Sequence, residues 1–507
     1  MEENFTKNRQ NRGQVKTRIT NSGYSHHGAA RDKPSLMSWY AMSKSPHEDI
    51  SENLPLLRAR SRDLYAGSPI GRGAVERIVL NAIGSGLKLN VRIDPMILGM
   101  TEDEAADWAQ RVEAEFDYWA SSKDCDYSRM MSFYDLQVLA FRSVLIDGEC
   151  LVMLKDNDYH DSTYPLQVMM IESERLQNPL APPARTMLDE GIELDKKGRP
   201  LAYWIANRNP ESEIINQPIL DYKRVKLFGY KSGKRNILHL MLSERIGQHR
   251  GVPLLAPVIE PLKQLTRYTD AELMAAVVSG MYSIFFEHEP HEEGVYREEE
   301  YVSEIGLGES PGYNKITQEQ MFGSVIDLPE GVKPVGISPG RPNENFAQFV
   351  EHLVKQIGGA LGIPAELLFM QFTASYSASR GALLEAWKLF KFYRTWFAAN
   401  FCQSIYEEWL TEAVLLGRIN APDYFTDKVK QKAYAWSEWV GPSQGQLNPL
   451  QEVNASIAKI GANLSTYERE AGELTGEDWD LIMRQRQREN KIIKEVEPVV
   501  QDTEQDR

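Results

Sequence analysis

The sequence is poor in cysteine and has no segment typical of secreted or membrane proteins. Its three cysteines, Cys125, Cys150 and Cys402, are far apart and lack CxxC spacing, so we predict buried thiols in a reducing compartment. The N-terminal residues lack the apolar core of a signal peptide, and no run of about 18 uncharged apolar residues occurs. We therefore expect a soluble protein that is made in a cytoplasm and has no membrane contact.

Motifs for nucleotide binding and catalysis are also missing. There is no Walker A sequence, and residues 84–86 lack the third glycine of G-x-G-x-x-G. Residues 308–312 match G-x-S-x-G, but Pro311 has no backbone N–H for an oxyanion hole. Residues 288–293 resemble a metal cluster in composition, but Pro290 breaks the helix that an H-E-x-x-H zinc site needs. We predict no catalytic residue, no metal site and no cofactor. A hydrolase or nuclease with an unrecognised site is the alternative.

The chain has no excess of positive charge, since its formal net charge is -15. Proteins that hold nucleic acid through phosphates normally cluster Lys and Arg. Tight non-specific DNA binding is therefore disfavoured, whereas low-friction contact is compatible with an acidic wall that repels the phosphate backbone. The exception is the N-terminal segment, because residues 1–60 hold ten cations and six acids. We predict that residues 1–45 form a disordered basic arm.

Residues 46–250 have the patterns of a mixed helix and strand fold. Helix-start signals occur at Ser68-Pro69 and at the capping box of Thr101 and Glu104. Strand patterns occur at residues 149–155, 166–172, 199–207 and 236–242. His239 lies inside the last of these, and we interpret it as a satisfied core histidine rather than a base. The predicted fold class is α+β.

A long amphipathic helix is predicted from residue 380 onward. Its apolar stripe steps by three or four residues and comprises Leu383, Trp387, Phe390, Tyr393, Phe397, Phe401, Ile405 and Trp409. If unbroken, this helix is roughly 45 Å long at about 1.5 Å per residue. A polar and aromatic loop at residues 371–380, poor in charge, precedes it. A rigid beam with a loop at its tip indicates a mechanical role rather than a catalytic pocket.

Four cations lie on the first turns of this helix: Arg380, Lys388, Lys391 and Arg394. Their usual role is a solvated face with apolar stems against the protein. Because they adjoin the polar loop, they are also candidates for contact with phosphate or with an acidic neighbouring subunit.

Two further helices, at residues 254–279 and 343–361, bracket a segment rich in proline and glycine, residues 282–340. This pattern indicates an insertion on a hairpin of helices. Between Glu287 and Glu309 the insertion has nine acids and one cation, which favours a solvated acidic loop, with an electrostatic docking surface as the second interpretation. Residues 450–493 are predicted to be helical after a linker at 442–448, and residues 495–507 form a polar tail.

Four segments, in this order and spacing, make the chain resemble the lambda-type portal proteins of tailed bacteriophages. They are Arg58-Ala-Arg-Ser-Arg-Asp-Leu-Tyr65 through Gly86, Gln248-His-Arg-Gly-Val-Pro-Leu-Leu-Ala-Pro257, Ile363-Pro-Ala-Glu-Leu-Leu368, and Ser375-Tyr-Ser-Ala-Ser-Arg-Gly-Ala-Leu-Leu-Glu-Ala-Trp387. Together they span roughly residues 50–490. Gln371 stands where this family commonly has an acidic residue, and Ala378 where it commonly has serine.

The resemblance implies a ring of about twelve subunits at one capsid vertex, with a central channel for double-stranded DNA. It also implies a division of the chain into the following parts: a wing at 46–250, stem helices at 251–281 and 341–365, a clip at 282–340, a tunnel loop at 366–379, a long wing helix and following segment at 380–440, a crown at 441–494 and a flexible tail at 495–507. Assembly would take place in the cytoplasm of the bacterial host, and the product would be part of the virion.

The resemblance further implies residues that meet DNA and partner proteins. The tunnel-loop residues would face DNA through neutral, replaceable contacts and are Gln371, Phe372, Thr373, Ala374, Ser375 and Tyr376. Clip acids would dock the terminase large subunit, which supplies the force, and later the head–tail connector proteins. These acids are Glu287, Glu289, Glu292, Glu293, Glu298, Glu299 and Glu300. Major capsid protein and scaffold would be further partners. A different head–tail adaptor is a third interpretation, but it should lack the long helix and the insertion.

Overall fold

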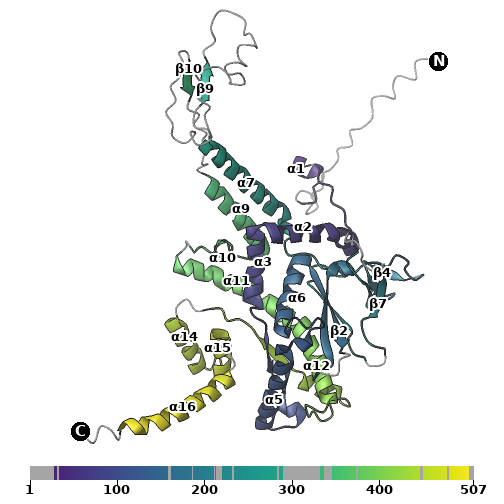
Figure 1. Cartoon of the computed structure of the whole chain (residues 1–507), viewed down its shortest axis with the longest axis vertical. Helices are drawn as coiled ribbons and strands as arrows, with labels where there is room; N and C mark the ends of the chain where they lie inside the picture. Colours follow the sequence, from purple (N-terminus) through teal and green to yellow (C-terminus); the bar gives the residue numbers. More distant parts are fainter. Residues whose placement is uncertain are drawn as a thin grey trace, which may run out of the picture.

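A computed structural model describes most of the chain: residues 28–30, 33–157, 162–184, 186–210, 212, 220–230, 233–281, 285–288, 332–335, 345–372, 375–445, 449–476 and 479–501. It is a mixed α+β structure, as predicted. A body of helices and small sheets has two projections, a helical hairpin at one end and a group of C-terminal helices at the other (Figure 1).

Two of the first helices of the body begin at the predicted local signals. Ser68 accepts a hydrogen bond from the Gly71 amide at the start of α3, and Thr101 forms a capping box with Glu104 at the start of α5. Gly148, with φ of 88°, ends α6 in the left-handed conformation. The helices are α1 (Pro34–Met37), α2 (Leu54–Gly67), α3 (Pro69–Ala82), α4 (Pro95–Leu98), α5 (Glu102–Ser121) and α6 (Phe133–Asp147).

Two antiparallel sheets pack on one another beside α6. The first has the order β3-β2-β8 and the second β4-β5-β6-β7. Strand β2 is buried on both faces: Cys150 and Val152 belong to the main core with the helices, while Leu151 and Met153 pack toward the second sheet. The strands are β2 (Glu149–Asp156), β3 (Leu166–Ile171), β4 (Met187–Asp189), β5 (Ile192–Leu194), β6 (Pro200–Ala206), β7 (Tyr222–Lys226) and β8 (Ile237–Met241).

The predicted long helix is present and crosses the body. It consists of α11 (Tyr376–Phe397), a π-helical turn (Ala398–Cys402) and α12 (Gln403–Leu415). Its stripe is buried as expected from Trp387 to Trp409, and Leu383 is half-buried. Phe401 stacks on Phe133 of α6, with ring centroids 5.7 Å apart. After it, α13 (Lys428–Tyr434) leads to β11 (Ser437–Val440), which pairs with β1 (Lys88–Val91).

The projecting hairpin consists of α7 (Ile259–Met281) and α9 (Phe346–Leu361). Tyr268 of α7 contacts Phe346 and Phe349 of α9, with ring centroids 5.5 and 5.1 Å away. Beyond the hairpin tip, β9 (Phe285–His288) pairs with β10 (Val332–Val335). This confirms two helices that bracket an insertion, although most of residues 282–340 lie outside the described part.

The C-terminal module consists of α14 (Pro449–Gly461), α15 (Tyr467–Leu474) and α16 (Trp479–Gln501). The predicted helical region is confirmed, and α14 ends at Gly461. The predicted polar tail was placed too early, because α16 continues through Gln501. Residues 502–507 lie outside the described part, as does most of the predicted basic arm.

Candidate functional site at the root of the α7–α9 hairpin

A buried carboxylate, Glu149, lies where the hairpin joins the body. Its side chain is fully buried and accepts hydrogen bonds from Arg58 Nη2 at 2.8 Å and Arg250 Nη2 at 2.6 Å. The Gly251 amide donates to Oε2 at 3.0 Å, and His239 Nε2 lies 3.0 Å from the same oxygen. The interpretation of His239 as a satisfied core histidine is therefore confirmed.

The electrostatics of this cluster favour an ionised carboxylate. Burial by itself raises the pKa of Glu149, but Arg250, His239 and Arg58 outweigh burial, and the pKa lies well below its usual range. The backbone is close-packed at the same place, because a Cβ added to Gly251 would overlap the carbonyl of Gly148. The chain is thus fixed just before it enters α7.

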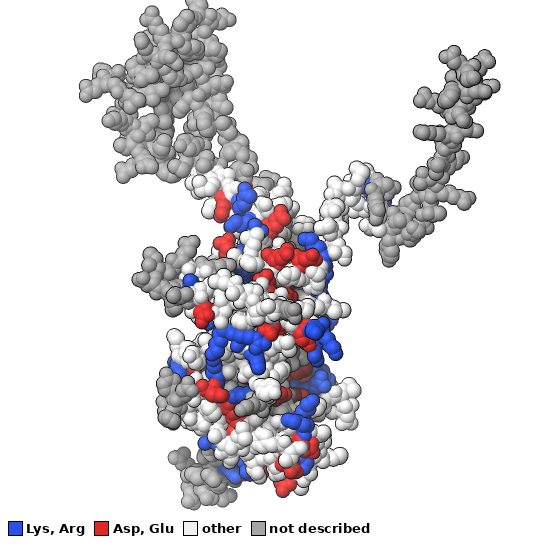
Figure 2. Space-filling view, turned by 90° about the vertical axis from the view of Figure 1, so that its right-hand side faces the viewer, with Lys and Arg blue, Asp and Glu red and all other residues white. Residues whose placement is uncertain are grey.

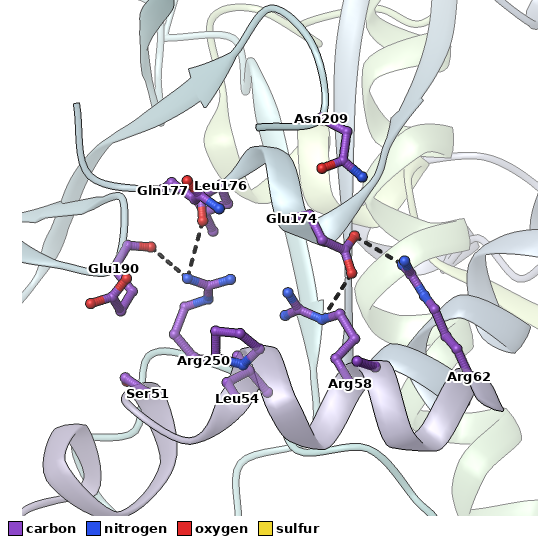
Figure 3. A pocket seen from close by; sticks show the side chains of 12 residues that line it. Ser51, Leu54, Arg58, Arg62, Glu174, Leu176, Gln177, Glu190, Asn209 and Arg250 are labelled. Carbon is purple, nitrogen blue, oxygen red and sulfur yellow. Dashed lines mark hydrogen bonds and ion pairs between the residues drawn. The ribbon is translucent and has the colours of Figure 1, made fainter. Parts of the chain in front are cut away.

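A cavity of about 110 Å³ beside this cluster is lined by Arg58, Arg62 and Arg250 (Figure 3). Arg62 Nη2 donates to Glu174 at 2.9 Å and its Nε to Asp147 at 2.7 Å. The Nη1 of Arg250 donates to the carbonyls of Leu176 and Glu190. Because each arginine is paired with a carboxylate, the cavity has no surplus positive charge for an anionic substrate, and it gives no support to a hydrolase or nuclease.

The polar loop before α11 is shorter than predicted. Residues 365–369 form α10 (Ala365–Phe369), and α11 already begins at Tyr376, because Ser375 Oγ accepts a hydrogen bond from the Ala378 amide and caps the helix. The loop is therefore residues 370–375, rather than 366–379. Thr373 and Ala374 lie outside the described part, and so does the side chain of Tyr376.

The loop presents neutral side chains to solvent. Phe372 is 50% exposed, and Gln371 and Met370 are exposed beside it. Met370 has a positive φ of 54°, an uncommon conformation for a side-chain-bearing residue. In Figure 1 the loop lies below the hairpin, on the side of the body opposite β4 and β7.

The four cations of α11 do not share one role. The prediction that Arg394 contacts phosphate or a neighbouring subunit is wrong. Its guanidinium donates to the carbonyls of Asn81, Ala82 and Pro442 at 2.7–3.0 Å, and burial lowers its pKa to about 10. Lys388 is exposed and pairs with Glu385 in its own helix at 2.6 Å. Arg380 and Lys391 face the C-terminal module.

The C-terminal module contacts the body through ion pairs that all have the same orientation. Arg380 pairs with Glu452 at 3.4 Å and Lys391 with Glu473 at 3.0 Å, while Arg92, which follows β1, pairs with Glu468. The cations all belong to the body and the acids all belong to α14 and α15. We call these three pairs the seam. Two cavities, of about 590 and 620 Å³, lie along it.

Sequence reasoning missed the seam acids and Glu149. A glutamate inside an apolar strand was the available signal for Glu149, since a charge is rarely buried unpaired. Among the predicted clip acids, Glu287 lies in β9 and its side chain is outside the described part, as are all the others. In the part of the chain that is described, no group of three His, Cys, Asp or Glu side chains is placed to hold a metal, and no helix is long and apolar enough to span a membrane.

Comparison with known proteins identifies the family. Residues 32–394 match the phage portal protein family of the lambda type. The chain belongs to the lambda family of phage portal proteins. Portal protein B of Escherichia phage lambda is 23% identical over 482 residues, covering 92% of this chain and 89% of that protein. The portal protein of Escherichia phage N15 is also 23% identical, with 92% and 90% covered.

Solved structures from the neck and the virion of native gene transfer agent particles are also similar. Their TM-scores are 0.43 and 0.41, with 14% and 15% identity, and they cover 82% and 83% of this portal protein. The family match confirms the resemblance given by the sequence. Because the family consists of structural portal proteins, this portal protein is a capsid-associated component of a phage-like particle and not an enzyme.

Replacing Glu149 by Gln in the portal protein removes the charge that Arg58 and Arg250 share. We expect the free energy of unfolding to fall by about 3–5 kcal/mol, because two buried guanidinium groups lose their partner. Chemical denaturation followed by tryptophan fluorescence measures this loss. The exposed Glu172→Gln is the control and should stay within about 0.5 kcal/mol of the parent.

The same pair of proteins gives a pH test. A carboxylate with a lowered pKa stabilises the fold above its unfolded pKa of about 4.3, and this contribution is lost as the pH falls through the folded value. The stability difference between parent and Glu149→Gln should therefore be constant near neutral pH and shrink in acid. A difference that grows as the pH falls would contradict the assignment of Glu149 as an ionised hub.

Charge reversal tests the seam. Glu468→Lys should place two cations together at Arg92, loosen the module and raise the rate of proteolysis in the linker at 442–448 by about 2- to 5-fold, as expected for an exposed ion pair. The double variant Arg92→Glu with Glu468→Lys should restore protection. Lys355→Glu is the matched control, because Lys355 is exposed and pairs with Glu351 of its own helix, α9. Equal cleavage of all four proteins would show that the seam does not hold the module.

Proposed function

We propose that about twelve copies of this portal protein close into a ring at one vertex of a capsid, and that double-stranded DNA passes through its bore during packaging and ejection. Membership of the lambda portal family across residues 32–394 carries the proposal. In it, the body is the wing, the α7–α9 hairpin the stem, the insertion after α7 the clip, and the C-terminal module the crown. The loop and the module lie on the side of the body opposite β4 and β7, and the hairpin projects from the body; this arrangement supports the division (Figure 1).

The loop before α11 is proposed as the narrowest collar of the bore. From residue 367 to residue 379 the sequence has no charged side chain, so a ring of these loops would present neutral groups to DNA. Phosphate contacts by Lys and Arg release counterions and hold DNA tightly, which a conduit must avoid. The exposed Gln371 and Phe372 offer only weak contacts that adjacent base pairs can replace in turn.

The contacts of the α11 cations are consistent with a neutral collar. Arg380 and Lys391 are paired with acids of the C-terminal module, and Arg394 with carbonyls. Lys388 pairs with Glu385 of its own helix and is the most exposed of the four, so it is the one we retain for contact with an acidic neighbouring subunit. On the face of the body that carries β4 and β7, Lys and Arg are interspersed with Asp and Glu (Figure 2). That face thus offers no continuous basic track for DNA.

The acidic insertion is proposed as the docking surface for the motor and later for the connectors. Strand β9, after which most of these acids follow in the sequence, lies at the far tip of the hairpin, away from the C-terminal module. Concentrated acids there would steer basic surfaces of the terminase large subunit and of the head–tail connectors. The sequence has no nucleotide motif, so the force would come from the terminase. Assembly with major capsid protein and scaffold would occur in the host cytoplasm.

Imaging purified protein along its symmetry axis, together with native mass measurement, tests the ring. We expect a closed ring whose mass is about twelve times the 57.8 kDa of one chain. Particles of a single chain without a bore would refute the proposal.

The collar is tested by Phe372→Lys in a packaging assay. A ring of added ammonium groups should bind phosphate and slow DNA passage, and high salt should relieve the delay. Phe372→Gln, which stays neutral, should behave like the parent. Phe425→Lys is the surface control, because Phe425 is 51% exposed on the wing and Phe372 is 50% exposed. Ser375 is left intact, because it caps α11. Packaging at the parent rate by Phe372→Lys would refute the assignment of this loop to the bore.

A further inference from the structure

The segment that precedes α2 is held to the body mainly by polar contacts. In the described part of the chain, no side chain from residue 33 to residue 49 is buried, and the next residue, Ile50, is the first buried one. A segment without apolar packing depends on hydrogen bonds and ion pairs for a fixed position. Most of these contacts lie at a π-helical turn, His47–Ser51, which meets the end of β4.

Asp189, the last residue of β4, lies between two imidazoles. His47 Nδ1 is 2.7 Å from Oδ1 and His249 Nδ1 is 2.8 Å from Oδ2. Ser51 Oγ also donates to Oδ1, at 3.1 Å. A carboxylate accepts more strongly from a charged donor than from a neutral one. We call His47, Asp189 and His249 the latch.

His249 faces a hydrogen-bond acceptor with each of its ring nitrogens. Besides its contact with Asp189, its Nε2 lies 3.2 Å from the carbonyl oxygen of Gly198. Neither a carboxylate nor a carbonyl can donate, so both contacts are hydrogen bonds only when both nitrogens carry a proton. The geometry of the latch therefore fits an imidazolium at this position.

The body side of the latch is fixed by the Glu149 cluster. Arg250 pairs with Glu149, and its Nη1 donates to the carbonyl of Glu190. Arg250 directly follows His249 in the sequence, and Glu190 directly follows Asp189. The carboxylate and one imidazole thus have fixed positions, so movement in the latch must come from the π-helical turn.

The charges around the latch favour protonated His47 and ionised Asp189. The hydrogen bond to Asp189 raises the pKa of His47, burial opposes it, and Glu190 and Glu52 add attraction. Burial by itself raises the pKa of Asp189, but the hydrogen bonds from His249 and His47 outweigh burial and lower it.

A second tie holds the same segment without a histidine. Arg245 donates to the carboxylate of Asp49, and its Nη2 donates to the carbonyl of Lys44 at 2.8 Å. An arginine–aspartate pair keeps both charges between about pH 6 and pH 8.5. This tie supplies a part of the attachment that does not change with pH in that range.

We propose that the latch is a proton-dependent switch, which holds residues 44–50 against β4 at low pH and loosens them as the pH rises. Deprotonation replaces charge-assisted hydrogen bonds to Asp189 by weaker neutral ones. Because the folded pKa of His47 is raised, its contribution is complete below the unfolded value of about 6.5 and is lost as the pH rises through the folded value. Release would lengthen the reach of the N-terminal segment by up to roughly 23 Å, at about 3.3 Å per residue.

Trypsin cleavage after Lys44 in the full-length protein reports the switch. From residue 34 to residue 57 Lys44 is the only Lys or Arg, and its carbonyl is one of the groups that are held. We expect Asp189→Asn to be cleaved about 2- to 5-fold faster than the parent near pH 6, with the ratio falling toward one near pH 8.5. Comparison with the parent at each pH removes the pH dependence of trypsin itself.

Three further variants separate a switch from the simple loss of a contact. His47→Gln keeps a donor but cannot be charged, so its ratio to the parent should also exceed one only at the acidic end. It leaves Asp189 and His249 in place and gives the same test should Asp189→Asn not fold. Asp49→Asn removes the second tie and should raise cleavage by the same factor at every pH. His352→Gln, exposed on α9, should match the parent throughout.

A cleavage ratio for His47→Gln that is constant or rises with pH would overturn the inference, and so would cleavage equal to the parent at every pH. All of these contacts lie within one chain, so neither outcome bears on the proposed ring.

A second measurement does not depend on cleavage. Deuterium exchange at the imidazole C2 position, followed by mass spectrometry of the peptide that contains His47, titrates with that imidazole. The midpoint should be lower in Asp189→Asn than in the parent, because the acceptor has lost its charge. Equal midpoints in the two proteins would contradict the latch.

Discussion

The carboxylate of Glu149 is the interaction on which the rest of the structure depends. It lies at the first residue of β2 and joins three segments that are far apart in sequence: α2 through Arg58, β8 through His239, and the turn before α7 through Arg250 and Gly251. Buried ion pairs contribute less to stability than to geometry, because desolvation offsets much of the attraction. Their effect here is to fix the direction in which the hairpin leaves the body. The contact of Gly148 with Gly251 leaves no room for a side chain at either position.

This arrangement explains why two of the segments that resemble the portal family occur together in space. Residues 58–65 contain Arg58 and Arg62, and residues 248–257 contain Arg250. These three arginines line the same cavity (Figure 3). The cluster looks like an anion site when its arginines are counted alone. Once Glu149, Asp147 and Glu174 are included, its charges balance. It is a joint and not a binding pocket.

Much of the fold was predictable from the sequence because its signals are local. The Thr101 capping box, the Ser68 cap, the glycine after α6 and the stripe of the long helix each depend on residues within one or two turns. The start of α11 was missed although its signal is local too, because Ser375 was assigned to a loop rather than to a helix cap.

The long-range contacts were not predictable from the sequence alone. Arg394 finds its carbonyl acceptors at Asn81 and Ala82, more than 300 residues away, and Glu149 finds Arg250 about 100 residues away. A single sequence gives the charge of such a residue but not its partner. The sequence therefore predicted the loop and the hairpin, but it did not predict the Glu149 cluster that joins the hairpin to the body.

Burial is distributed unevenly along the chain, and this distribution has a mechanical consequence. The body holds the large aromatic core, whereas the C-terminal module is attached by exposed ion pairs and has no buried apolar side chain among its described residues. Exposed pairs are individually weak and are screened by salt. The body and the joint at Glu149 thus form the densely packed part of the chain. Salt should therefore loosen the attachment of the C-terminal module and leave the core of the body unchanged.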